Sequence, residues 1–113
     1  MSGRRAKRFD LALAQVIPVA VEAGARRFLG VVMDISSTGV LVRCDDLLPA
    51  GAIAQLAIGK DRESVRTLAV VRRVVPGMGL GFEFRNMSIT NRDFLNRLLR
   101  HLSHESIVRG SGG

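Results

Sequence analysis

The sequence predicts a small all-β protein, a barrel or sandwich of antiparallel strands, followed by one helix. Six short apolar stretches, separated by turn residues, follow one another at regular spacing before residue 86. Beyond that point the apolar residues recur at intervals of three and four, which is the period of an amphipathic helix. A chain of 113 residues has the length of a single domain, and its composition is apolar enough for a hydrophobic core.

The first two expected strands lie on either side of a turn. The first covers residues 11–21 and contains Pro18, which has no backbone N–H to donate to a sheet. We therefore expect this strand to lie at an edge or to bulge at the proline. A turn at 22–25 then leads into the second strand, residues 27–35, which ends at a polar segment.

Four further strands complete the expected sheet. The segments between them are rich in glycine and proline, as at Pro49 and Gly51 in the loop that follows the third strand. Pro76 and Gly77 are expected to close a hairpin between the last two strands. The four strands are expected at residues 40–44, 52–58, 65–75 and 80–84.

The C-terminal segment is expected to form a helix from about residue 91 to residue 106, capped by Ser88 or Thr90. Its apolar stripe, which we expect to cover one opening of the barrel, consists of Phe94, Leu95, Leu98, Leu99 and Leu102. The expected division of the chain is an N-terminal arm (1–8), a barrel domain (9–86), a helical segment (87–108) and a disordered tail (109–113).

The chain carries a formal net charge of +7, and all but two of its 17 Lys and Arg residues are arginine. The arginine fork matches phosphate groups and the O6/N7 edge of guanine, so we expect an anionic partner. A genome that favours arginine codons is the alternative explanation, and composition alone does not separate the two. The single cysteine, Cys44, fits a packing role and a cytoplasmic location. No apolar run has the length of a membrane span, so membrane insertion is not expected.

Catalytic and metal sites are not expected. Ser36 has no histidine nearby in the sequence to activate it, and no glycine-rich phosphate loop is present. His101 and His104 lie three apart on the expected helix, without the Cys or carboxylate cluster that a metal site needs. The charge alone leaves a nucleic-acid binder open, but the chain has no Trp or Tyr, and its five Phe residues form no stacking row.

A basic arm precedes the first expected strand. It contains Arg4 and Arg8, four positions apart, with Arg5 and Lys7 between them. Two guanidinium forks on such an arm can close over a ligand that offers phosphates and guanine edges. A solvated basic tail is the alternative interpretation of the same residues.

A polar element with the pattern Asp-x-Ser-x-x-Gly occupies residues 34–39, at the turn between the second and third strands. The Asp34 carboxylate can accept hydrogen bonds from the N1–H and amino group of a guanine. The Ser36 hydroxyl can donate to a phosphate or accept from a base, and Gly39 allows close approach to the backbone. The alternative is a Ser/Thr turn that only joins two strands.

These two motifs, in this order and around the first two expected strands, resemble the signature of the PilZ domain family, which comprises bacterial receptors for cyclic di-GMP. The glycine-rich segment 79–84 and the helix that follows are also similar to the family's closing strand and helix. The resemblance implies a six-stranded antiparallel PilZ-like β-barrel with a C-terminal α-helix. It also implies cyclic di-GMP as the ligand, contacted by Arg4, Arg5, Arg8, Asp34, Ser36 and Gly39.

Two further positions are interpreted through the resemblance. Arg73 falls where many family members carry Trp or Arg near a guanine face, and a guanidinium can stack there. Gly3, directly before the arginine motif, leaves open whether one ligand or a stacked pair binds.

The expected function is that of a receptor or adaptor that acts on an unidentified protein effector, and not that of an enzyme. The charges of the arm repel one another, so we expect the arm to become ordered only when ligand phosphates neutralise them. Two alternatives remain: a PilZ-like protein-interaction module in motility or pilus assembly that acts without the nucleotide, and a small-barrel nucleic-acid binder.

Overall fold

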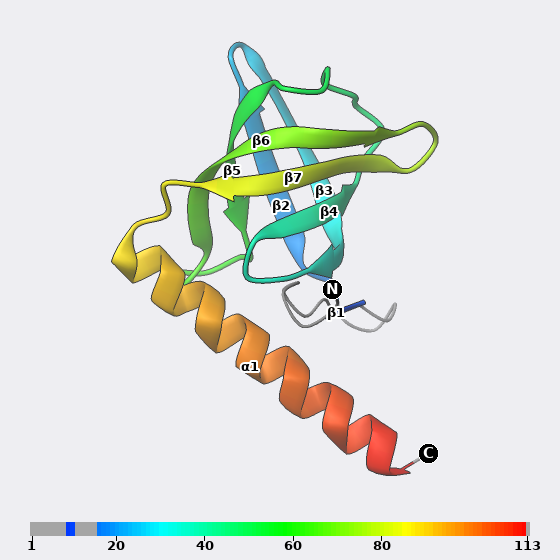
Figure 1. The fold of residues 1–113 in the computed structure, drawn as a ribbon, viewed down its shortest axis with the longest axis vertical. Helices are drawn as coiled ribbons and strands as arrows, with labels where there is room; N and C mark the ends of the chain where they lie inside the picture. The colour runs from blue at the N-terminus through cyan, green and yellow to red at the C-terminus, as the bar shows by residue number, and fades with distance from the viewer. Residues whose placement is uncertain (1–8, 11–15, 113) are drawn as a thin grey trace, which may run out of the picture.

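Turn residues divide the chain into strands that close into a barrel (Figure 1). The structure, a computed structural model, describes residues 9–10 and 16–112, with side chains for 16–103. Its sheet has the order β1-β3-β2-β5-β6-β7-β4, and a further pairing of β3 with β4 closes β2 to β7 into a six-stranded antiparallel barrel. The predicted fold class is confirmed. The strands are β1 (Phe9–Asp10), β2 (Pro18–Ala23), β3 (Arg26–Ile35), β4 (Gly39–Arg43), β5 (Ile53–Ile58), β6 (Val65–Val75) and β7 (Gly79–Arg85).

The core lies inside the barrel, because alternate side chains of each strand point inward. In β2, for example, Val19 and Val21 are buried while Ala20 and Glu22 are exposed. The largest fully buried side chains include Ile35, Ile58, Leu80 and Leu95, which come from four different elements. These apolar contacts hold the strands in one register, so the outward side chains have fixed neighbours across the strands.

The N-terminal part of the sheet differs from the prediction. The first barrel strand begins at Pro18, and most of the earlier residues of the strand expected at 11–21 lie outside the described part of the chain. Pro18 is the first residue of β2, where a missing N–H is tolerated, and its carbonyl accepts from Gly59 at 2.9 Å. A short additional strand that the sequence did not reveal, β1, pairs with the end of β3.

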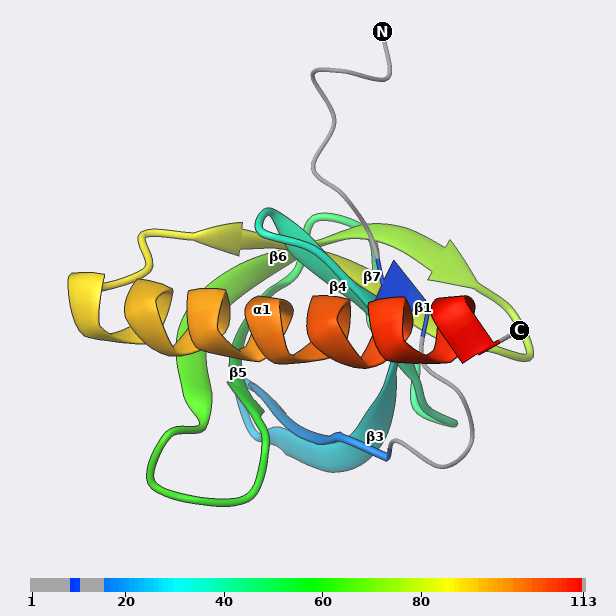
Figure 2. The same ribbon diagram turned by 90° about the horizontal axis from the view of Figure 1, so that it is seen from below.

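The C-terminal helix α1 (Ile89–Gly112) crosses one end of the barrel, as Figure 2 shows. Ser88 caps it, because its hydroxyl accepts the Asn91 N–H at 3.1 Å. All residues of the predicted apolar stripe are buried in the core or packed against it, which confirms the stripe. The helix continues past residue 108 into the segment that was expected to be disordered. In the described part of the chain, no helix is long and apolar enough to span a membrane.

Candidate functional site

A bulge in β3 places Asp34 on the outer surface of the barrel. Val32 pairs with Val42 and points into the core, so regular alternation would also turn Asp34 inward. The register shifts between these two residues, and Asp34 instead pairs with Leu41. One extra residue on the bulged strand reverses the direction of the side chains that follow. The half-buried Asp34 therefore stands outside, while the next residue, Ile35, returns to the core.

A second bulge does the same for Arg73 in β6. Val71 is fully buried and pairs with Phe82, so alternation alone would direct the side chain of Arg73 into the core. The register shifts between Val71 and Arg73, and Arg73 pairs with Gly81. Both Arg72 and Arg73 are exposed as a result. A charged side chain at an inward position is the sequence signal from which this bulge could have been inferred.

The two bulges bring Asp34 and Arg73 onto one row across the barrel. Asp34 pairs with Leu41, Leu41 with Gly81, and Gly81 with Arg73. The row crosses three strand spacings of about 4.8 Å, or roughly 14 Å between its ends. We call the outer surface around these four residues the motif face. The sequence identified the two ends of the row but not Leu41 and Gly81 between them.

The missing side chain at Gly81 leaves the middle of the motif face open. A Cβ built on Gly81 would lie 3.2 Å from the Cβ of Arg73 and 3.6 Å from its Nε, so the Arg73 side chain lies beside this space. A pocket of about 380 Å³ opens here. Two predicted site residues, Gly39 and Arg73, line it, together with Thr38, Val40, Leu41, Arg72, Gly81, Phe82 and Glu83.

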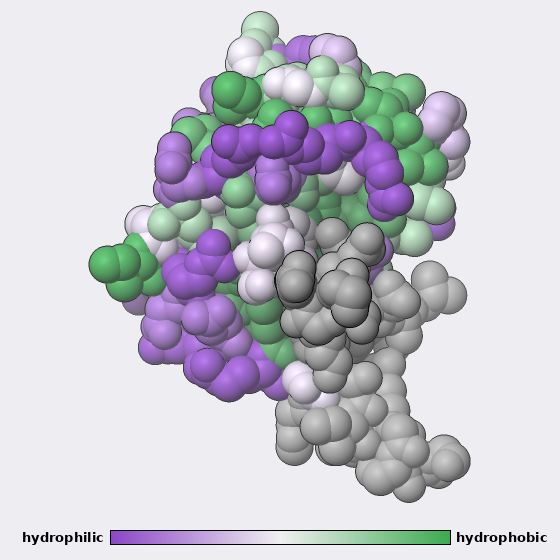
Figure 3. All heavy atoms as spheres, viewed as in Figure 1, coloured by the Kyte–Doolittle hydropathy of each residue, from purple (hydrophilic) through white to green (hydrophobic). Residues whose placement is uncertain are grey.

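Hydrophilic side chains form a band over β6 and β7 on this side of the molecule (Figure 3). Glu83 accepts from Arg72 Nε at 2.8 Å and lies 3.4 Å from Arg85 Nη2. The hydrogen bond and charge of Arg72, helped by Arg85, hold the pKa of Glu83 below its usual range. Arg73 makes no ion pair with any described residue. An anion that binds at the motif face would therefore meet at least one cation, Arg73, that no acidic side chain of the described chain neutralises.

The Ser36 side chain lies inside the turn. It is fully buried. The hydroxyl accepts the Thr38 N–H at 3.2 Å and lies 3.2 Å from the Thr38 hydroxyl and 3.5 Å from the Gly39 carbonyl oxygen. The Ser36 N–H also donates to that carbonyl at 2.9 Å. The observed geometry is that of a Ser/Thr turn, and the hydroxyl would have to leave it before it could touch a ligand.

Gly39 is required by the sheet itself. It is buried where β4 pairs with β7, and a Cβ there would collide with the carbonyl oxygen of Phe82. Its backbone conformation is an ordinary one, since it is not among the positive-φ glycines. Close approach of β7 therefore explains the glycine, while its place in the pocket lining keeps it at the motif face.

The short strand β1 connects the arginine motif with the Asp-x-Ser-x-x-Gly motif. Phe9 pairs with Ile35, and Asp10 pairs with Asp34. Arg8 directly precedes Phe9 in the sequence, and Ser36 directly follows Ile35. The predicted ligand residues Arg4, Arg5 and Arg8 themselves lie outside the described residues, as does Gly3.

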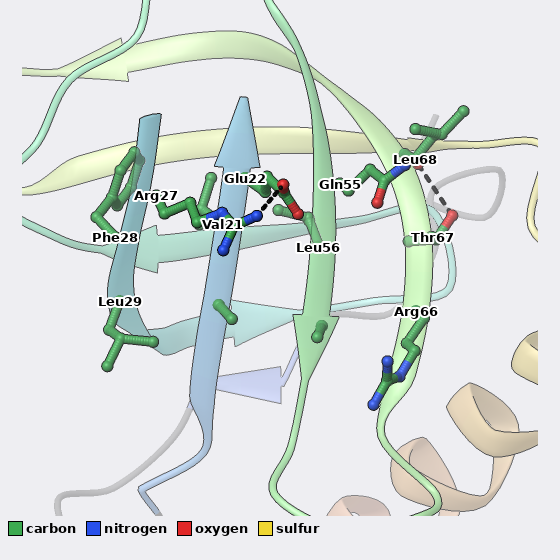
Figure 4. A pocket seen from close by; sticks show the side chains of 12 residues that line it. Val21, Glu22, Arg27, Phe28, Leu29, Gln55, Leu56, Arg66, Thr67 and Leu68 are labelled. Atoms are coloured by element: carbon green, nitrogen blue, oxygen red, sulfur yellow. Dashed lines mark hydrogen bonds and ion pairs between the residues drawn. The ribbon is translucent and has the colours of Figure 1, made fainter. Parts of the chain in front are cut away.

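A second concavity lies on another part of the outer surface of the barrel (Figure 4). Across β3, β2, β5 and β6, Leu29 pairs with Ala20, Ala20 with Ala57, and Ala57 with Arg66. The two small alanines form the floor of a groove of about 670 Å³, and Leu29, which is 75% exposed, and Arg66 stand at its sides. We call this the alanine groove. It contains none of the predicted site residues.

Metal-ligating side chains and the single thiol are the other candidates for chemistry in the described chain. Among its residues, no three His, Cys, Asp or Glu side chains gather as metal ligands would. Cys44 packs against the core; burial, together with the charges of Asp46 and Asp45, raises the pKa of its thiol. A thiol whose pKa is raised is less reactive at neutral pH, which fits the predicted packing role.

A model of the PilZ domain family matches residues 2–101. Among solved structures, the PilZ domain of YcgR from Escherichia coli with c-di-GMP has a TM-score of 0.72 and 19% identity, and the match covers 96% of this chain and 97% of that one. YcgR from E. coli in complex with c-di-GMP has a TM-score of 0.76 and 18% identity, and the match covers 96% of this chain and 50% of that one.

MrkH of K. pneumonia, described as a c-di-GMP-dependent transcription regulatory factor, has a TM-score of 0.76 and 16% identity. The match covers 90% of this chain and 52% of that one. The chain thus spans about half the length of MrkH and of the longer YcgR structure. No curated protein matches its sequence. The identities to solved structures are low, and these likenesses concern the fold. The family model, in contrast, extends over every barrel strand and into α1, and on this evidence the chain belongs to the PilZ domain family.

Proposed function

We propose that this protein is a cytoplasmic receptor that binds cyclic di-GMP on its motif face and passes the signal to a protein effector. The observation that carries the proposal is the row from Asp34 to Arg73, which two separate bulges place on the same outer surface. Structural neighbours in the family have been solved with c-di-GMP, which supports the choice of ligand.

The two ends of the row offer complementary chemistry to a guanine nucleotide. Asp34 can accept from the N1–H and amino group of one guanine. Arg73, with no acidic partner in the described chain, can stack on a base or pair with a phosphate. Gly81 between them leaves room for a flat base against the strand. Ser36 and Gly39 contribute by shaping the turn and the pocket wall.

The N-terminal arm supplies the remaining cations in this proposal. The pairing of Phe9 with Ile35 supports it, because a residue directly after Arg8 is then held at the start of the Asp-x-Ser-x-x-Gly turn. Arg4, Arg5, Lys7 and Arg8 repel one another, and ordering them costs roughly 1–2 kcal/mol per residue. A ligand with two phosphates removes the repulsion, so arm and ligand together would form a new surface for the effector.

Calorimetric titration tests the nucleotide assignment. We expect cyclic di-GMP to bind more tightly than cyclic di-AMP, GTP or a short single-stranded DNA, and the affinity to fall as salt rises. Arg8→Ala should reduce the affinity by about tenfold or more, because each hydrogen bond to a charged group contributes roughly 1.5–3 kcal/mol. Equal binding of cyclic di-GMP and cyclic di-AMP would show that guanine is not read, and tight DNA binding would favour the nucleic-acid alternative.

Amide hydrogen exchange tests the role of the arm. Residues 3–8, which precede β1, should gain strong protection when saturating cyclic di-GMP is added, while β1 and the barrel strands change little. An arm already protected in the free protein, or equally exposed with ligand, would contradict ligand-induced ordering without affecting the nucleotide assignment.

A second candidate function is constitutive contact with a protein partner. The alanine groove favours it, because Leu29 and Ile53 are large apolar side chains that are 75% and 67% exposed near this surface. In that case Leu29→Glu would abolish the biological activity, while Asp34→Ala would leave it intact. The opposite pattern would support the nucleotide receptor.

A further inference from the structure

The turn of the Asp-x-Ser-x-x-Gly motif is fastened to the C-terminal helix by one side chain. Arg92 Nη1 donates to the Ser37 carbonyl at 2.6 Å, across 55 positions of sequence. Arg92 is half-buried and makes no ion pair with any described residue. It does not line the pocket of the motif face. The hydrogen bond is therefore the one polar contact by which its side chain is seen to act in the described structure.

The position of Arg92 is unfavourable for the helix itself. It lies in the first turn of α1, which contains no acidic residue. A cation at a helix N-terminus is repelled by the partial positive charge of the free N–H groups. The helix start is already fixed in other ways, since Ser88 caps it and Asn91 Oδ1 accepts the Arg66 N–H from β6 at 2.7 Å. The backbone that carries Arg92 is therefore held in place by other residues, and the Arg92 side chain does not stabilise the helix.

The Ser37–Thr38 peptide group is held from both sides. Its carbonyl oxygen accepts from Arg92, and its N–H donates to the Ser36 hydroxyl at 3.2 Å. Since a peptide group is planar, fixing both ends sets the orientation of the whole unit. The flanking carbonyl of Thr38 accepts from the Phe84 N–H at 2.9 Å. Arg92 is the only one of these contacts that comes from outside the barrel strands and the turn.

We propose that Arg92 is a positioning residue for the nucleotide site: through the Ser37 carbonyl it holds the 34–39 turn in the conformation that receives the ligand. This rests on the proposed function. A turn that is already ordered loses less conformational freedom when a ligand binds, so its affinity is higher. By thermodynamic reciprocity, a nucleotide that binds this turn also stabilises the seating of α1 on the barrel.

The test compares Arg92→Met, Arg92→Lys and the control Arg100→Met, with cyclic di-GMP titrated calorimetrically. Met keeps an unbranched apolar stem but has no donor, and Lys keeps a donor. Arg100 is exposed on the same helix, and its replacement removes the same charge without touching the turn. We expect Arg92→Met to weaken binding about fivefold to tenfold, Arg92→Lys to recover most of the loss, and Arg100→Met to stay within about twofold of the wild type.

Amide exchange of the free proteins separates this proposal from the nucleotide assignment. The Thr38 amide should exchange faster in Arg92→Met than in the wild type, while the amides of β5 and β6 keep their protection. If wild-type protein does not bind cyclic di-GMP, the function fails while the exchange result still decides whether Arg92 orders the turn. The proposal would be overturned if Arg92→Met bound cyclic di-GMP with the affinity of the wild type and its Thr38 amide exchanged at the rate of the wild type. Loss of protection throughout the barrel in Arg92→Met, or failure of Arg92→Lys to restore binding, would overturn it as well.

Discussion

The motif face and the alanine groove lie on one barrel and share β3 and β6, yet they are built differently. At the groove, the pairings among β3, β2, β5 and β6 run without a register shift, and the small Ala20 and Ala57 of the two central strands form the floor. At the motif face, β3 and β6 each contain a bulge. The comparison teaches that the same two strands place the apolar Leu29 and Leu68 among charged neighbours where alternation is regular, and turn Asp34 and Arg73 outward where it is shifted.

The two faces also differ in how their charges are used. At the groove, the exposed Arg27 pairs with Glu22 across β2 and β3 at 3.1 Å. At the motif face, Glu83 is shared by two arginines, and Arg73 beside it has no acidic partner in the described chain. An unpaired cation beside a pocket is available to an anionic ligand, whereas a surface ion pair contributes little to binding or stability. Each face has an arginine without an acidic partner in the described chain, Arg73 at the motif face and Arg66 at the groove, but of the two it is Arg73 that lies in one row with Asp34.

The largest effect is expected at Asp34. Asp34→Ala should lower the affinity for cyclic di-GMP by about tenfold or more, because a guanine would lose a charged acceptor. The free energy of unfolding should change little, since Ile35 and Val32, not Asp34, anchor this part of β3 in the core. Calorimetry and thermal unfolding measure the two quantities. Asp45→Ala, an exposed acid beyond β4, is the control. Unfolding of Asp34→Ala under native conditions would assign Asp34 a structural role.

A smaller effect is expected at Arg73. Arg73→Ala should weaken binding a few-fold, and Arg73→Trp should keep most of the affinity, because either a guanidinium or an indole can stack on a base. Arg72→Ala is the matched control: it removes the same charge from the neighbouring position, which is already paired with Glu83. Equal binding by all four proteins would remove Arg73 from the site and leave it as a surface charge on a bulge.

Ser36→Ala should affect stability more than binding. The substitution removes the acceptor of the Thr38 N–H, so the free energy of unfolding should fall by about 1 kcal/mol. Affinity should fall by less than about threefold if the hydroxyl acts only within the turn. Urea unfolding and calorimetry on the same samples make the comparison. A tenfold loss of affinity with unchanged stability would mean that the turn opens and that Ser36 contacts the ligand directly.

The parts of the fold that depend on local pattern could be predicted from the sequence. The strands after Pro18 lie close to the expected residues, because alternation and turn glycines are local signals. Ser88 was one of two expected caps, and the stripe from Phe94 to Leu102 packs as its spacing indicates. The two motifs were interpreted through a family resemblance, and their roles in binding stay predictions.

What could not be predicted depends on residues far apart in the chain. The bulges arise from strand pairing, and a run such as Val70–Val75 shows only that an arginine falls at an inward position. The two residues of β1 are too few for a periodic signal. The contact of Arg92 with Ser37 joins positions 55 apart, and the sequence alone gave no reason to connect them.

The smallest effect on nucleotide binding is expected at the alanine groove. Leu29→Glu adds a negative charge at a side chain that is 75% exposed, so the barrel should fold normally. The groove lies on strands whose register is unbroken, and Leu29 is separated from Asp34 along β3 by the bulge. Affinity for cyclic di-GMP should therefore stay within about twofold of the wild type, as expected for a surface charge whose field is screened over about 10 Å in 0.1 M salt. A loss comparable to that of Asp34→Ala would mean that the two faces are coupled through β3, and that the bulge transmits strain along the strand instead of separating two independent surfaces.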